Sequence, residues 1–273
     1  MTNRIKKISR RNTILFATFA TLVIIATGLF LFIRQDRLNK NLLNAVEAND
    51  AQRVISLLDQ GANPNSRKIL DKKRSVLIIL QTMFHLSKDD LNEDATPLLL
   101  ALNPNFMTET NEDLEPPENV AMIEALLKHG ANPNIGYRLR VNNQIFTPLY
   151  FAIFGHKKDT ALLLLKYGSN LKTPFGMNLL PIAMNIEDKN CILLEMMVQR
   201  GSSVNKGIGN ICPLHEAAIC RNPIIIKFLL SKGAVAPKND LRFKQTMKQL
   251  KSLSMIPEFQ KSYALLKKAG YTE

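Results

Sequence analysis

Five glycines mark a repeat in the body of this chain, and each follows a stretch rich in paired leucines or other apolar residues. They lie at positions 61, 130, 168, 201 and 233, so successive separations are 69, 38, 33 and 32 residues. A period of 20 to 50 residues is typical of a stacked-repeat architecture, in which no unit buries its apolar face alone. The glycines close the segments LLDQGANPN, LLKHGANPN, LLKYGSNLK, MVQRGSSVN and LLSKGAVAP.

Prolines recur in phase with these glycines. In each of the last three units a proline lies 20 residues before the glycine. Threonine followed by proline is typical of a helix start, where the hydroxyl caps a free N–H and proline fits the first turn. Glycine just after a helix adopts the left-handed conformation that ends it. We therefore expect each unit to be a helix hairpin. The starts are TPLLLAL at 96–102, TPLYFAI at 147–153, LPIAMNI at 180–186 and CPLHEAA at 212–218.

The chain resembles the ankyrin repeat family, most clearly in TPLYFAIFGHKKDTALLLLKYGS and CPLHEAAICRNPIIIKFLLSKGA. The resemblance implies an all-α solenoid of about five repeats at 42–237, with Leu180-Pro181 in place of Thr-Pro in the fourth unit. It also implies that His215 orders the turns between repeats through hydrogen bonds. The residues expected to have structural roles are Gly61, Thr96, Pro97, Gly130, Thr147, Pro148, Gly168, Gly201, Pro213, His215 and Gly233.

The array departs from its period in three places: two insertions, at about 66–95 and 103–118, and five extra residues between Gly130 and Pro148. The first insertion contains an apolar stretch that predicts a short helix, which either covers core or forms a ledge for a partner or for lipid headgroups. The second insertion is acidic and contains prolines, so we expect a surface loop. Residues 238–273 predict a capping hairpin whose first helix turns Phe243, Met247, Leu250 and Met255 inward.

The segment 13–33 is 21 residues long and uncharged, which suits a helix that crosses a bilayer core of about 30 Å. A cleaved signal peptide is the alternative, but its apolar region is shorter and ends in small residues, unlike LFLFIRQD. Five basic residues precede the segment. They predict that tail 1–12 stays in the cytoplasm, and that the repeats follow linker 34–41 on the other side. The chain has no Asn-x-Ser/Thr acceptor, which favours a bacterial inner membrane with the repeats in the periplasm.

The net charge of +13 is uneven. Residues 1–40 contribute +7, residues 238–273 contribute +5, and the body contributes only +1. The basic residues therefore flank the apolar segment and solvate the cap, and they do not indicate a nucleic-acid partner.

Motifs for catalysis or metal binding are incomplete. HEAAI at 215–219 lacks the second histidine of a zinc helix, and the run from Gly207 to Cys212 lacks the third glycine of a dinucleotide loop. Cys212 and Cys220 are expected at opposite ends of one helix, roughly 12 Å apart, which is too far for a disulfide. We expect no enzyme activity, no cofactor, no metal and no small-molecule substrate.

The resemblance implies a protein-binding module that uses the finger turns and the first helices of the repeats. The short linker would hold the first unit close to the bilayer, so a membrane or periplasmic protein partner is expected. The alternative is a structural spacer, or a stabilising cover for an envelope enzyme, without specificity of its own. The candidate contact residues are Tyr137, Arg138, Arg140, Tyr150, Lys172, Phe175 and Lys206.

Overall fold

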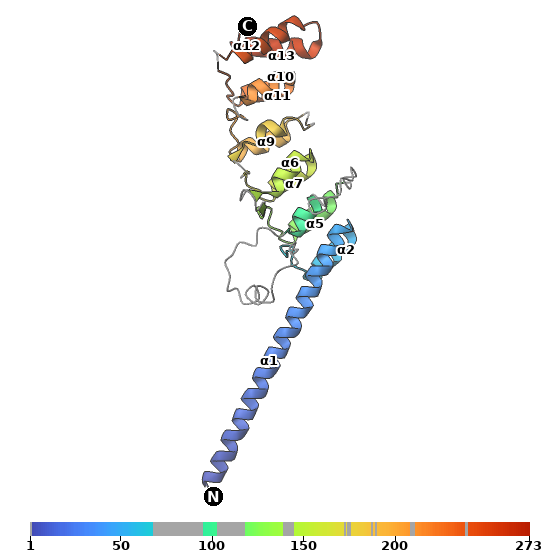
Figure 1. Ribbon diagram of the computed structural model, residues 1–273, viewed down its shortest axis with the longest axis vertical. Coiled ribbons are helices and arrows are strands. Elements are labelled where there is room, and N and C mark those ends of the chain that lie inside the picture. Colours follow the sequence, from blue (N-terminus) through green and yellow to red (C-terminus); the bar gives the residue numbers. More distant parts are fainter. Residues whose placement is uncertain are drawn as a thin grey trace.

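The structure is a computed structural model of the 273-residue chain. It describes residues 2–67, 95–102, 118–138, 145–171, 173, 176–186, 188, 190–207, 211–237 and 240–273. The fold is all-α, with one long helix followed by short helices arranged as hairpins (Figure 1). The first six described helices are α1 (Thr2–Glu47), α2 (Ala51–Asp59), α4 (Pro97–Leu102), α5 (Val120–Lys128), α6 (Pro148–Phe154) and α7 (Lys158–Lys166). Those that follow are α8 (Leu180–Ala183), α9 (Ile192–Gln199), α10 (Pro213–Ile219), α11 (Pro223–Ser231), α12 (Leu241–Ser252) and α13 (Pro257–Lys268).

The hairpins stack in chain order along the long axis of the molecule, away from the N-terminus (Figure 1). The first helices form one column, in which α1 packs on α4, α4 on α6, α6 on α8, α8 on α10 and α10 on α12. In the second column α2 packs on α5, α5 on α7, α7 on α9 and α11 on α13. This arrangement is the all-α ankyrin-repeat fold, with a capping hairpin formed by α12 and α13.

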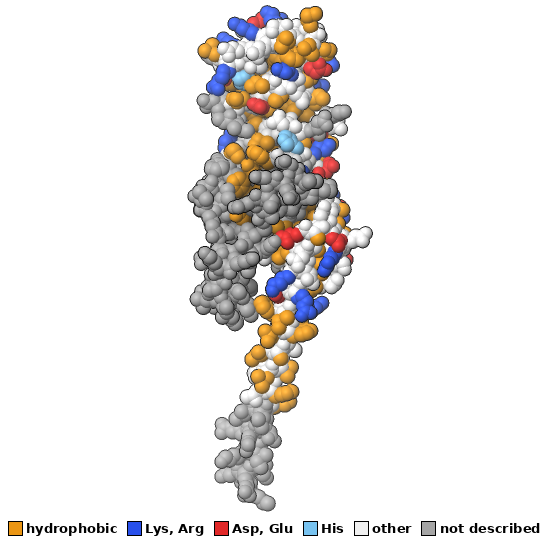
Figure 2. All heavy atoms as spheres, turned by 45° about the vertical axis from the view of Figure 1, so that its right-hand side comes forward, with side chains coloured by type: hydrophobic (Ala, Val, Ile, Leu, Met, Phe, Trp, Pro, Cys, Tyr) orange, Lys and Arg blue, Asp and Glu red, His pale blue; other side chains and the backbone are white. Residues whose placement is uncertain are grey.

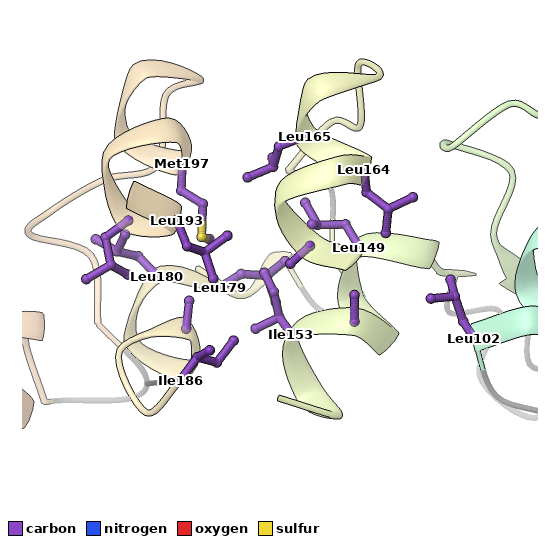
Figure 3. Close-up of a cluster of buried hydrophobic side chains, with 14 of the residues drawn as sticks. Leu102, Leu149, Ile153, Leu164, Leu165, Leu179, Leu180, Ile186, Leu193 and Met197 are labelled. Atoms are coloured by element: carbon purple, nitrogen blue, oxygen red, sulfur yellow. The ribbon is translucent and has the colours of Figure 1, made fainter. Parts of the chain in front are cut away.

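The core runs continuously between the two columns rather than forming a separate centre in each unit. Figure 3 shows Leu149 and Ile153 of α6 between Leu102 on one side and Leu179 on the other. All four side chains are almost completely buried. Because each unit supplies one wall of its neighbour's core, the hairpins depend on stacking for their stability.

The glycine marks have the expected conformation. Gly61, Gly130, Gly168, Gly201 and Gly233 have φ between +79° and +97°, the left-handed region that a residue with a Cβ adopts at a cost. At the first of these turns the Gly61 N–H donates to the Leu58 carbonyl, and the Ala62 N–H donates to the Leu57 carbonyl. The predicted helix ends are thus confirmed by their dihedral angles.

Asparagines four residues after these glycines join successive turns. The Asn65 amide nitrogen donates to the Gly130 carbonyl (2.9 Å), and its oxygen accepts from the Asn132 N–H (2.7 Å). Asn134 makes the same pair of bonds to Gly168 (3.1 Å) and Asn170 (2.7 Å). The turns are therefore tied to one another along the edge of the stack.

Helix α1 continues without a break from residue 2 into the first hairpin, so the predicted linker 34–41 is helical. The Gln35 amide donates to the Gly61 carbonyl (3.0 Å), and the Asn39 oxygen accepts from the Asn63 N–H (2.8 Å). Leu42 and Val46 of the same helix are buried in the core. The end of α1 therefore serves as the first helix of the first unit.

The part of α1 that precedes the stack exposes its apolar side chains. Residues 18–47 contain an 18-residue stretch with a mean hydropathy of 1.7, none of it buried, which is long and apolar enough to cross a membrane. Figure 2 shows this apolar band, with basic side chains where the helix joins the stack. A signal sequence can have the same length and composition.

Phe243, Met247 and Leu250 are buried as predicted, but the prediction for Met255 is wrong, since it is 96% exposed. The reason is that α12 ends at Ser252, which places Met255 in the turn before α13. Most of the two insertions, at 68–94 and 103–117, lies outside the described residues.

Candidate partner-binding surface

Three aromatic side chains form a row along the start of the third unit. Phe146 ends strand β2 (Ile145–Phe146), and Tyr150 and Phe154 follow on α6 at intervals of four residues. The Phe146 and Tyr150 rings lie 5.1 Å apart edge to face, and the Tyr150 and Phe154 rings are stacked at 4.8 Å. Phe154 is 51% exposed. We call Phe146, Tyr150 and Phe154 the aromatic row.

The start of α6 fixes the direction of this row. The Thr147 hydroxyl accepts from the Tyr150 N–H (3.3 Å), and Pro148 occupies the first turn. Leu149 and Ile153 are fully buried on the opposite side of the helix. Because residues four apart lie on one helical face, burial of this pair turns Tyr150 and Phe154 outward.

A two-stranded hairpin holds the first ring of the row. Strand β1 (Tyr137–Arg138) pairs antiparallel with β2, and Tyr137 lies opposite Phe146. The strands approach closely at Gly136, where an added Cβ would lie 2.5 Å from Ile145 Cγ2 and 2.7 Å from the Phe146 carbonyl oxygen. Glycine is therefore required at position 136.

A second feature lies at the turns of the fourth unit. The Lys206 ammonium donates to the Gly176 carbonyl (2.9 Å), and the buried Asn178 amide donates to the Ser203 carbonyl (2.7 Å). These residues line a hollow of about 390 Å³ together with Met177 and other turn residues. The lysine is held against its own chain and borders an open, partly polar hollow.

The predicted contact residues are partly brought together. Tyr137 pairs with Phe146, whose ring touches Tyr150, so these two predicted residues belong to one surface. Lys206 lies apart, at the hollow. Arg138 is described only as part of β1, and Arg140, Lys172 and Phe175 lie outside the described residues. The sequence reasoning missed Phe146 and Phe154, although their spacing of four residues on each side of Tyr150 is visible in the sequence.

His215 makes different contacts from Tyr150, although each is the second residue after a helix-starting proline. Its Nε2 lies 3.0 Å from the Thr246 hydroxyl, and its ring packs edge to face on Phe243 at 5.3 Å. Burial lowers its pKa below the usual 6.5. The resemblance implied a bond to the turns between repeats, whereas the side-chain contact joins α10 to α12 of the cap.

The three cysteines are better suited to packing than to nucleophilic chemistry. Burial raises the pKa of the Cys191, Cys212 and Cys220 thiols, which keeps them protonated and weakly nucleophilic near neutral pH. Cys212 and Cys220 lie at the two ends of α10, as expected. Within the described parts of the chain, no group of three His, Cys, Asp or Glu side chains is placed to hold a metal ion.

The Ankyrin repeat family model matches residues 210–240, which include α10 and α11. No curated protein matches this chain. Ankyrin repeats are in general non-enzymatic modules for protein–protein interaction. The match and the stacked hairpins together support an ankyrin-repeat protein that is, in general terms, a protein–protein interaction module.

Proposed function

We propose that this protein is a membrane-anchored binding module, in which α1 spans the bilayer and the aromatic row contacts a membrane or periplasmic protein. The observation that carries the binding proposal is the aromatic row, which begins at Phe146 on β2 and ends at the exposed Phe154 on α6. Aromatic side chains are enriched at the centres of protein interfaces, where they bury a large area at little cost in conformational entropy. Phe154 offers such an area at the surface, Tyr150 stacks on it, and Phe146 packs edge to face on Tyr150.

Two observations support the anchor: the exposed apolar side chains of α1, and the way in which the C-terminal part of this helix joins the stack. Large apolar side chains from Phe16 to Ile33 are exposed, and such a band in water would favour aggregation. A cleavage site would have to follow this band, at about 34–41. Instead, Gln35 and Asn39 are helical there and bond to the first turn of the stack. An uncleaved helix keeps these bonds.

Topology has a direct test. The basic residues before the apolar segment predict a cytoplasmic N-terminus, so a reporter active only outside the cytoplasm should be active when fused after Glu273. Extraction of membranes at alkaline pH should leave the full-length chain in the pellet. A stable but silent fusion would overturn the orientation, and release into the supernatant would overturn the anchor.

Binding is tested by chemical cross-linking in intact membranes. The double variant Tyr150→Ala/Phe154→Ala should lose the cross-linked partner seen with the wild type. The control, Ile192→Ala, removes a side chain that is 48% exposed on α9, in the other column. We expect it to retain the partner. If the aromatic double variant also retains the partner and the protein's activity in vivo, the spacer alternative gains and specific binding through this row fails.

A further inference from the structure

A groove runs between α11 and α13, where the last repeat meets the cap, on the second-helix column and apart from the aromatic row. It has a volume of about 930 Å³. Its apolar lining comes from Pro223 and Ile224 at the start of α11, and from Ala264 and Leu265 of α13. Ile224 is 48% exposed, so this large apolar side chain of the lining is only partly covered.

The rim of this groove is basic. Arg221, Lys227, Lys261 and Lys268 border it, against one acid, Glu258. The Arg221 guanidinium lies over the Phe259 ring at 4.7 Å. In the described part of the chain, none of the three lysines is in an ion pair, in contrast to Lys232 nearby, which pairs with Glu195 at 2.7 Å. The rim therefore presents lysine cations that form no ion pair with a described carboxylate.

We propose that this groove binds an acidic amphipathic helix of a protein partner. Such a helix lays an apolar face into a groove between two helices, and its acidic flanks then lie beside the rim cations. The four-to-one excess of basic residues selects an acidic occupant, while the apolar lining requires a ligand with an apolar face. The basic rim and the apolar lining together therefore define the chemistry of the expected ligand.

Other occupants fit this site less well. A second copy of the chain related by a twofold axis would bring one basic rim against another, which is repulsive. A nucleic acid would meet few aromatic groups for stacking in a lining that is mostly apolar. The groove lies at the end of the stack opposite the N-terminal end of α1, so the bilayer that α1 is proposed to span is remote from it (Figure 1). Figure 2 shows basic and apolar side chains close together at that end.

The test measures binding of a fluorescent peptide to the full chain in detergent micelles. The probe is a synthetic helix of about 15 residues with leucine on one face and glutamate on the other. We expect saturable binding that weakens with added salt. Lys227→Glu/Lys268→Glu should weaken it about tenfold or more, because two attractive contacts become repulsive. The control Lys166→Glu/Lys248→Glu makes the same change in net charge at exposed lysines outside the groove, and it should bind like the wild type.

A matched pair of isoleucine variants tests the apolar contact. Ile224→Ser should weaken peptide binding several-fold, whereas Ile192→Ser, at an equally exposed isoleucine on α9, should not. The proposal is overturned if the peptide does not bind, if both lysine pairs weaken it equally, or if Ile224→Ser has no effect. It is also overturned if anionic lipid vesicles bind with the same dependence on Lys227 and Lys268 while the peptide does not. None of these outcomes depends on the aromatic row, so this proposal can fail while the proposed function stands.

Discussion

The third and fifth units place different side chains at the same point of the same helix. Tyr150 and His215 each follow the starting proline by two residues, at Pro148 and Pro213. His215 is buried and bonds to Thr246 of the cap, whereas Tyr150 is half-buried and stacks on the exposed Phe154. One position of the repeat thus stabilises the stack in one unit and supports a surface in the other. Four predictions test this contrast.

The largest expected effect on stability is at the fifth unit. His215→Ala removes a buried ring that packs on Phe243 and leaves the Thr246 hydroxyl without its partner on α10. We expect a loss of about 3 kcal/mol in the free energy of unfolding, from the cavity and the lost hydrogen bond. Denaturant unfolding of the full chain in detergent, followed by circular dichroism, measures it. His215→Gln, which keeps a donor, should cost less. An unchanged midpoint would show that the contact with the cap contributes nothing.

The hairpin before the third unit gives the next effect. Gly136→Ala places a methyl group against Ile145 and the Phe146 carbonyl, so the strands must separate and Phe146 must shift. We expect a loss of about 2 kcal/mol in unfolding free energy, together with weaker partner cross-linking. The matched control is Gly28→Ala, because an added Cβ there meets nothing within 4 Å. Equal behaviour of the two variants would contradict the role given to the hairpin.

Tyr150 should separate stability from binding. Tyr150→Ala removes a half-buried ring and should cost only about 1 kcal/mol in unfolding free energy, but it should abolish cross-linking to the partner. Tyr150→Phe retains the ring contacts with Phe146 and Phe154 and is expected to retain both properties. If Tyr150→Ala instead destabilises the chain as much as His215→Ala and leaves cross-linking intact, the two units do not differ as described.

The smallest effect is a dependence on pH. Burial is the main cause that lowers the pKa of His215 below 6.5, Arg242 acts in the same direction, and Asp240 and Glu216 oppose it. The folded state therefore binds this proton less readily than the unfolded state. The stability is fully present above about pH 6.5 and falls as the pH decreases below it.

The comparison of wild type with His215→Gln isolates this contribution. We expect the wild type to lose more unfolding free energy than the variant between about pH 7.5 and pH 5.5, because only the wild type has the buried imidazole. The difference should be smaller than the effect of His215→Ala. Parallel pH profiles for the two proteins would contradict the assigned direction.

The repeat architecture was predictable because it leaves periodic marks in the sequence. Each second helix is followed by a residue with positive φ, a conformation that favours glycine. Glycine therefore recurs in the sequence at the spacing of the repeats, at Gly61, Gly130, Gly168, Gly201 and Gly233. The end of α12 was harder to predict from the sequence. Met255 approximately continues the apolar spacing of α12, but this helix ends at Ser252. Whether the chain forms one more helical turn or a loop there depends on how α13 packs.

The candidate surface was predicted less well than the fold. Tyr150 was recognised from its place on a first helix, but the row that it forms also needs Phe146, which is brought in by the pairing of β2 with β1. The exposure of Phe154 depends on how the neighbouring hairpins stack. The groove between α11 and α13 is likewise formed by two units, since Ile224 and Leu265 are 41 residues apart in the sequence and share one lining.

The most direct test of specific binding through the third unit is site-specific photocrosslinking in intact membranes. A photoreactive amino acid replaces Phe154 in one chain and Ile192 in another, two positions of similar exposure on opposite columns of the stack. We expect a discrete cross-linked product with a membrane or periplasmic protein from position 154, which Tyr150→Ala removes, and none of that product from position 192. The same product from both positions, or none from position 154, would contradict it.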